Sequence, residues 1–192
     1  FVHITEQYLT YPMAGDVQDE WAASLLRVLI KNGPAVLQNR NDYDANANLM
    51  WAATMALNGL IAKGVAEDWS THMIGHEITA LYNIDHAQTL AIVLPGILRN
   101  RKNEKSAKIL HYAKSVWGIN SGNIDADLEE AIAKTESFFN SVGIKTRLSD
   151  YNIPESAIDI ICKKLEDKKY VKLGENKNIT PAVVKEVLRS RL

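Results

Sequence analysis

The sequence has little cysteine, no cluster of basic residues and no long uninterrupted apolar segment. A single cysteine, Cys162, excludes an internal disulfide bond and is typical of a reducing cytoplasm, where we expect the protein to reside. A formal net charge of -1 without a basic run argues against nucleic acid or an anionic membrane as a partner. No apolar run reaches the roughly 18 residues that a transmembrane helix requires.

Several structural patterns are also missing. No alternating strand pattern, internal repeat or Pro/Ser-rich linker is visible. There is no G-x-G-x-x-G turn to bind a dinucleotide, and Gly59, Gly64, Gly75 and Gly96 lie in helical context. We therefore predict an all-α fold, with residues 1–192 forming one domain of about eight to ten helices.

Three helix features bear on the architecture. The run Asn32-Gly33-Pro34 is expected to stop the helix that contains Trp21. Residues 45–62 predict a long, almost uncharged helix that should be central and buried. Pro95 lies inside the predicted helix that ends near Arg99, and it should kink that helix because it lacks a backbone N–H donor.

Three of the five histidines fall within residues 69–89. His72 and His76 are four residues apart, so on a helix their imidazoles share one face. Asn83 and Asp85 indicate a turn, which places His86 at the start of the next helix. Two rings from one helix and one from the next could close around a metal ion.

Other interpretations of this cluster remain open. A pair of histidines four apart on a helix is more often an exposed feature than a metal site. A zinc protease needs a glutamate inside the pair, whereas Gly75 precedes the second histidine and Glu77 follows it, so neither protease pattern is met. Imidazole suits several transition metals, so the histidines do not identify the ion.

The segment WSTHMIGHEITALYNIDHAQT, residues 69–89, resembles the second signature of the iron-containing (group III) alcohol dehydrogenases. Its flanks, MWAATMALNGL and LAIVLP, are most similar to the butanol dehydrogenases and NADPH-dependent aldehyde reductases of that family. The resemblance runs from FVHITEQYLT to LGENKNIT and covers essentially the whole chain. It implies the multi-helix C-terminal domain of the dehydroquinate synthase-like fold.

The resemblance also implies a ligand set. In the family one divalent metal is held by a carboxylate and three histidines, the first two ligands forming D-x-x-x-H. His3, His72 and His86 match the three histidines, and the aspartate would lie two residues before Phe1. His76 matches a histidine near the metal that is not a ligand in most members. It is expected to shuttle the alcohol proton or orient the substrate, or else only to support a ligand.

The same resemblance implies partners that the chain does not include. We expect the 192 residues to be the C-terminal domain of a protein about twice as long, whose N-terminal α/β domain binds the nicotinamide cofactor. The expected metal is Fe or Zn, NADP(H) is favoured over NAD(H), and the substrate is a small aldehyde or alcohol. The full-length protein is expected to be a homodimer, and the isolated domain is expected to bind metal weakly and to lack dehydrogenase activity.

Two other functions are compatible with the sequence. One is a glycerol dehydrogenase-like enzyme or a lyase of the same fold, and the other is a stand-alone helical metal-binding module or metallohydrolase.

Asp85 is predicted to be a helix N-cap rather than a support for His86. His111 is expected to be structural or exposed. Trp51, Trp69 and Asn58 could line the substrate cleft, but large aromatics on a helix are more often core residues, so we leave all three out of the predicted site.

Overall fold

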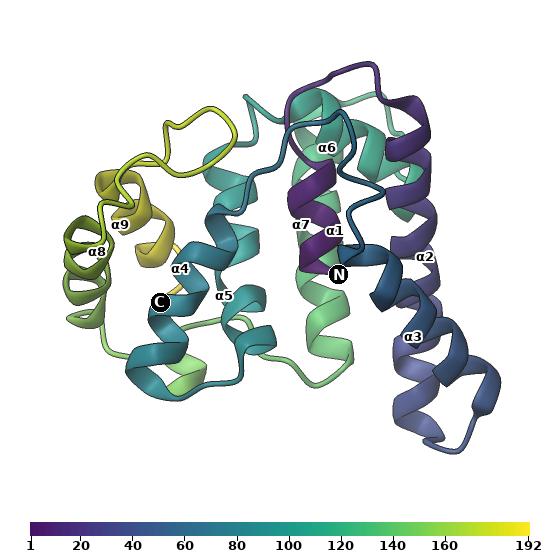
Figure 1. Cartoon of the computed structure of the whole chain (residues 1–192), viewed down its shortest axis with the longest axis horizontal. Helices are drawn as coiled ribbons and strands as arrows, with labels where there is room; N and C mark the ends of the chain where they lie inside the picture. Colours follow the sequence, from purple (N-terminus) through teal and green to yellow (C-terminus); the bar gives the residue numbers. More distant parts are fainter.

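The computed structural model describes residues 1–192 and confirms the all-helical prediction, with nine α-helices (Figure 1). The only β-type pairing is an isolated bridge between Leu173 and Ile179. None of the helices combines the length and the apolar composition needed to cross a membrane. The helices, with one short π-helical and one 3₁₀ segment, are α1 (Val2–Tyr8), α2 (Asp16–Gln38), α3 (Tyr43–Leu57), α4 (Ser70–Tyr82), α5 (His86–Asn100), α6 (Ser106–Tyr112), η1 (Ala113–Trp117), α7 (Ile124–Ser141), η2 (Ser149–Tyr151), α8 (Ala157–Asp167) and α9 (Pro181–Arg189).

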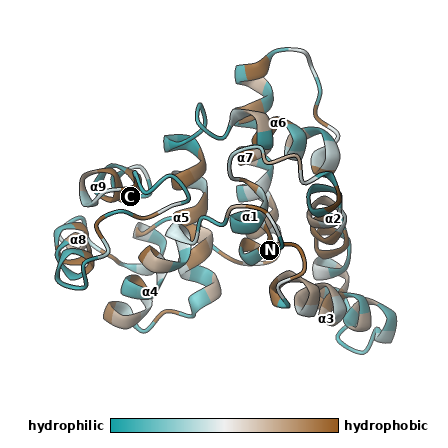
Figure 2. Ribbon diagram, turned by 45° about the horizontal axis from the view of Figure 1, so that its top comes forward, coloured by the Kyte–Doolittle hydropathy of each residue, from teal (hydrophilic) through white to brown (hydrophobic).

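Helix α5 lies between two groups of helices that each have their own apolar core. The first core is built mainly by α1, α2, α6 and α7, and the second by α4, α8 and α9. Leu90, Leu94 and Leu98 of α5 enter the first core, whereas Ile92 and Ile97 enter the second. Figure 1 shows α5 in this central position, and Figure 2 shows its largely hydrophobic composition. Because α5 serves both cores, it fixes the position of any side chain at its first turn.

The prediction that residues 45–62 form a central, buried helix is wrong. Helix α3 ends at Leu57 and lies at the outer edge of the molecule beside α2 (Figure 1). Met50 and Trp51 are 73% and 67% exposed, so Trp51 is not a core residue either. The buried face of α3 is an alanine stripe, and Leu49 packs against the core only as a partly buried side chain. The buried members of α3 are Ala45, Ala52 and Ala56.

The predicted stop at Asn32-Gly33-Pro34 is also wrong, because α2 continues to Gln38 with Pro34 inside it. Asn32, which could compete with the helix for backbone groups, instead donates its Nδ2 hydrogen to the carbonyl of Val28 at 2.8 Å. Packing of α2 along α3 overrides the local penalty of about 3 kcal/mol for an internal proline. Pro95 lies inside α5, as predicted.

Candidate metal centre

The connection between α4 and α5 sets the entrance to the candidate site. Helix α4 starts after Trp69, whose φ of 61° is left-handed, and it ends at Asn83, whose φ of 52° is also left-handed. Helix α5 begins at His86, so the break predicted at residues 83–85 is confirmed. Asp85 occupies the N-cap position, as predicted, although its side chain makes no capping hydrogen bond.

Four histidines from three helices lie together. The ring centroids of His3 on α1 and His72 on α4 are 4.5 Å apart, and those of His72 and His86 are 5.3 Å apart. His76 stacks on His86 at 4.6 Å and is exposed to solvent. The structure therefore brings together every residue that the sequence singled out for the site. His111 lies elsewhere, hydrogen-bonded to Tyr8.

Two of the imidazole nitrogens in this cluster are buried without a protein partner. Nε2 of His72 and Nδ1 of His86 are buried and form no hydrogen bond. A buried polar atom without a partner is costly, at about 1–3 kcal/mol, so such an atom calls for an explanation. A cation between the rings would provide one, and the set of neutral nitrogen donors fits Fe or Zn. The side chains do not by themselves form a group of three or more ligands arranged to hold a metal ion.

The surroundings of the rings favour neutral imidazole. Burial lowers the pKa of His72 to about 4 against the opposing charge of Asp68. Burial and the neighbouring His72 lower the pKa of His3 to about 4. The pKa values of His76 and His86 are lowered as well, mainly by burial. All four rings are therefore uncharged near pH 7, which is the form that coordinates metals or accepts a proton.

Sequence reasoning missed Glu6 as a residue of this site. Its side chain is buried, its Oε1 accepts the backbone N–H of Thr71 at 2.6 Å, and its Oε2 contacts Nδ1 of His72. Burial and the nearby Asp68 carboxylate raise the pKa of Glu6 well above its usual range. A signal was present, because Glu6 follows His3 by three residues and so shares its helix face.

Trp69 was left out of the predicted site, but its indole lies against the histidines. Its ring centroid is 5.1 Å from that of His72 and 6.1 Å from that of His3. The indole Nε1 donates to Oε2 of Glu67 at 2.7 Å, on the exposed side. Trp69 therefore forms one wall of the site and is only partly buried.

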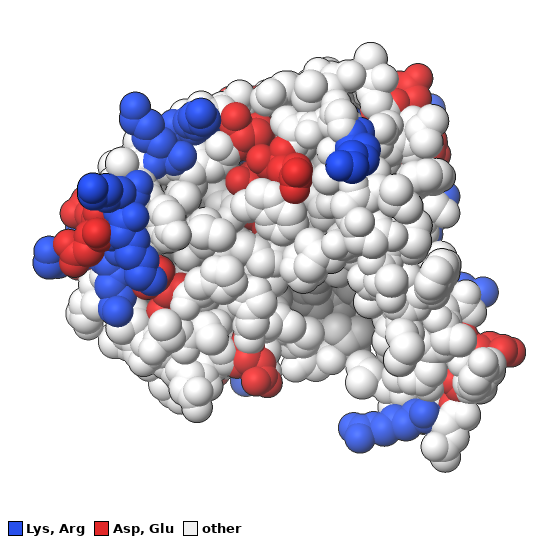
Figure 3. Space-filling view, viewed as in Figure 1, with Lys and Arg blue, Asp and Glu red and all other residues white.

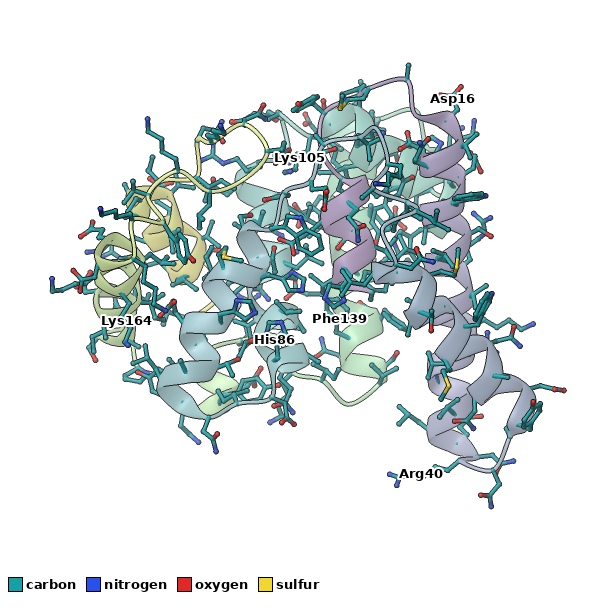
Figure 4. The ribbon with its side chains drawn as sticks, viewed as in Figure 1. Asp16, Arg40, His86, Lys105, Phe139 and Lys164 are labelled. Carbon is teal, nitrogen blue, oxygen red and sulfur yellow. The ribbon has the colours of Figure 1, made fainter.

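An apolar cavity of about 290 Å³ opens beside His3 and His86. Its walls include Phe1, Leu90 and Phe139, and the rings of Phe1 and Phe139 meet edge to face at 5.2 Å. Figure 4 shows His86 and Phe139 close together near the centre of the view, and Figure 3 shows a hollow with few charged side chains in that part of the face. An apolar space next to the histidines suits an aliphatic group better than a charged one.

The whole chain, residues 1–192, matches the Fe-containing alcohol dehydrogenase family, C-terminal, and the chain belongs to this family. It is 49% identical over 187 residues to the NADPH-dependent aldehyde reductase YqhD of Escherichia coli, covering 97% of this chain and 48% of that protein. It is 38% identical over 192 residues to the NADH-dependent butanol dehydrogenase B of Clostridium acetobutylicum, with coverage of 97% and 48%.

Solved structures show the same relationship. The substrate- and cofactor-free aldehyde reductase YqhD from E. coli superimposes with a TM-score of 0.98 and 46% identity, over 100% of this chain and 50% of that one. The NADH-dependent butanol dehydrogenase A of Thermotoga maritima superimposes with a TM-score of 0.91 and 29% identity, over 98% and 49%. The predicted family and fold are thus confirmed, and the chain spans about half the length of the relatives it matches.

Proposed function

We propose that this chain is the metal-binding domain of a nicotinamide-dependent aldehyde reductase or alcohol dehydrogenase. The observation that carries the proposal is the buried, unpartnered Nε2 of His72 among the rings of His3 and His86. Relatives named NADPH-dependent aldehyde reductase and NADH-dependent butanol dehydrogenase support this reaction class. NADP(H) is favoured over NAD(H), because the NADPH-dependent relative has the higher identity of these two.

In this proposal His3, His72 and His86 hold one divalent metal, Fe or Zn, as neutral nitrogen donors. A bound divalent metal supplies Lewis-acid polarisation of a carbonyl or alkoxide oxygen during hydride transfer. His76 is exposed beside His86, so its imidazole can hold or accept the alcohol proton. The apolar cavity beside His3 and His86 receives the carbon chain of a small aldehyde or alcohol and excludes water from it.

The remaining components of the enzyme would come from outside these residues. An upstream α/β domain would bind the nicotinamide, and a carboxylate two residues before Phe1 would complete the ligand set. We expect the complete protein to act as a homodimer. On this proposal the 192 residues alone bind metal weakly and do not reduce aldehydes, since one anionic ligand and the cofactor site are absent from the sequence.

The test is metal analysis of the full-length protein and of the variants His72→Ala and His86→Ala, with aldehyde-dependent NADPH oxidation followed in parallel. Both variants should lose metal and activity together. His111→Ala is the matched control, because His111 is a histidine on α6 outside the cluster, and it should retain both. Retention of metal and turnover in the two site variants would refute the proposal, and metal-dependent hydrolysis without nicotinamide would favour a metallohydrolase.

A further inference from the structure

Glu6 makes two contacts that no other residue of the cluster duplicates. It lies on α1, one turn after His3, and it reaches the start of α4, 66 residues away along the chain. Oε1 accepts the backbone N–H of Thr71, and Oε2 faces Nδ1 of His72. The residue is 2% exposed and His72 is 4% exposed, so water does not compete for these contacts.

The position of Glu6 is fixed by its own surroundings. Its carbonyl oxygen accepts the N–H of Asp68 at 2.8 Å, which ties α1 to the segment just before α4. Oδ1 of Asp68 accepts the N–H of Ser70 at 2.9 Å, and Oδ2 lies 3.0 Å from Nζ of Lys105. Nζ of Lys105 also donates to the carbonyl of Leu9 at 2.8 Å. These contacts hold the backbone of Glu6 against the start of α4, and the N–H of Thr71 holds its carboxylate.

The two imidazole nitrogens of His72 have different environments. Nδ1 faces the carboxylate, whereas Nε2 is buried without a partner next to the rings of His3 and His86. A neutral imidazole has one N–H donor and one lone pair, so the nitrogen that holds the proton decides which nitrogen can bind a metal. A cation bound at Nε2 of His72 favours the ionised form of Glu6, and the ionised carboxylate keeps the proton on Nδ1 and leaves the lone pair on Nε2.

We propose that Glu6 is a positioning residue for the metal, which orients the His72 ring through Nδ1 and directs the Nε2 lone pair toward the ion. This inference rests on the proposed function, because it requires His72 to be a ligand. It assigns Glu6 no contact with substrate or metal. Its effect passes entirely through the tautomer and the orientation of His72.

The substitution Glu6→Gln tests this role. An ionised glutamate offers only acceptors, whereas glutamine offers one carbonyl oxygen and one donor NH₂. Because the N–H of Thr71 must occupy an acceptor, the NH₂ group is left to face Nδ1 of His72, and it favours the tautomer with the proton on Nε2. Zinc affinity of the full-length protein, measured by chelator competition, should fall about 10- to 100-fold. The visible spectrum of the cobalt-substituted protein should change with it.

Glu67→Gln is the matched control, because Glu67 is a glutamate that pairs with the indole of Trp69 but not with His72. It should keep the wild-type zinc affinity and cobalt spectrum. If His72→Ala loses metal while Glu6→Gln binds zinc as tightly as the wild type, the positioning role is refuted and the proposed function stands. If His72→Ala also retains zinc, the proposed function fails and the positioning role fails with it.

A measurement on the wild type covers the case in which Glu6→Gln does not fold. Nitrogen-15 NMR of the zinc-loaded protein, labelled at histidine, should show a protonated Nδ1 and an unprotonated Nε2 for His72. A proton on Nε2 of His72, or zinc bound through Nδ1, would overturn the inference. The resonance is assigned as the one that disappears in His72→Ala.

Discussion

A Cβ atom on Gly75 would lie 3.0 Å from Cδ2 of Leu90 and 3.1 Å from Oγ1 of Thr89. Gly75 faces α5 from the turn of α4 that joins His72 to His76. The missing side chain lets the two helices approach, and the same approach brings His76 onto His86 with ring centroids 4.6 Å apart. Gly75 therefore lies at a point of close contact between α4 and α5.

Gly75→Ala should destabilise the protein despite the better helix propensity of alanine. Alanine gains about 1 kcal/mol in a helix, but overpacking against Leu90 costs about 1–3 kcal/mol. In a Leu90→Val background the clashing Cδ2 is removed, so the same substitution should cost less or become stabilising. Urea unfolding of the four proteins measures a coupling energy of about 0.5–3 kcal/mol. No coupling would mean that Gly75 is not a contact point between α4 and α5.

Lys105→Met should strongly destabilise the fold. Nζ of Lys105 pairs with Asp68 at 3.0 Å and with Glu175 at 2.5 Å, and all three side chains are only 3% exposed. Removing the cation leaves two buried carboxylates without a counter-ion, which costs about 3–5 kcal/mol. Burial already raises the pKa of Glu175, so the loss should diminish at low pH as this carboxyl takes up a proton.

The control for this substitution is Lys163→Met. Lys163 pairs with Asp167 at 3.3 Å, but the two side chains are 73% and 63% exposed. An exposed pair of this kind contributes little, so the change in the free energy of unfolding should stay within about 0.5 kcal/mol. Chemical unfolding of both variants measures the change. If Lys105→Met and Lys163→Met lose the same free energy of unfolding, the burial of Lys105 with Asp68 and Glu175 has no energetic consequence.

How much of the site could be predicted depended on the distance between partners along the chain. His72, His76 and His86 were found from local signals, the four-residue spacing and the turn at Asn83. His3 came only from the family resemblance, because no local rule connects it to α4. Glu6 was missed, since its partner His72 is 66 residues away and only tertiary packing joins them.

The burial of helix faces was harder to predict from the sequence than the helices themselves. The absence of charge in residues 45–62 was interpreted as burial, yet Met50 and Trp51 of α3 are exposed. Helix α5 is the one that is apolar all round, because it serves two cores. Pro34 is a second example of a misleading local signal. It predicted a helix stop, but the packing of α2 along α3 overrides this signal and α2 continues to Gln38. Local patterns define the helices better than they define which face is covered.

Glu136 should make stability depend on pH in the acid range. Burial opposes its ionisation, but hydrogen bonds and charge from Arg191 and Arg99 prevail and lower its pKa to about 2. Because the folded pKa lies below the unfolded value, the stabilisation is full above about pH 5 and is lost as pH falls toward 2. The contribution is on the order of 3 kcal/mol.

The substitution Glu136→Gln should therefore reduce stability at pH 7 and flatten the decline between about pH 5 and pH 2. Thermal unfolding followed by circular dichroism across this range measures both effects. Glu130→Gln is the control, because Glu130 lies on the same helix and is exposed. If the unfolding temperature of Glu136→Gln falls with decreasing pH as steeply as that of the wild type, another carboxylate dominates acid unfolding.

His76→Gln should separate metal binding from proton transfer. His76 stacks on His86 but is exposed, so glutamine can replace it without opening the core. If His76 moves the alcohol proton, the full-length variant should retain its metal while kcat falls about 10²- to 10⁴-fold. Loss of metal in the variant would instead assign His76 a role in supporting a ligand.

The pH profile gives an independent readout of the same role. Burial and the neighbouring His72 lower the pKa of His76 below 6.5, so its neutral form is the main species at pH 7. Alcohol oxidation by the wild type should decline as pH falls through that lowered pKa, because a protonated imidazole cannot accept the alcohol proton. His76→Gln should lack this limb, whereas His111→Gln should keep it along with wild-type turnover. An unchanged acid limb in His76→Gln would place the essential base on another residue, even if kcat is reduced.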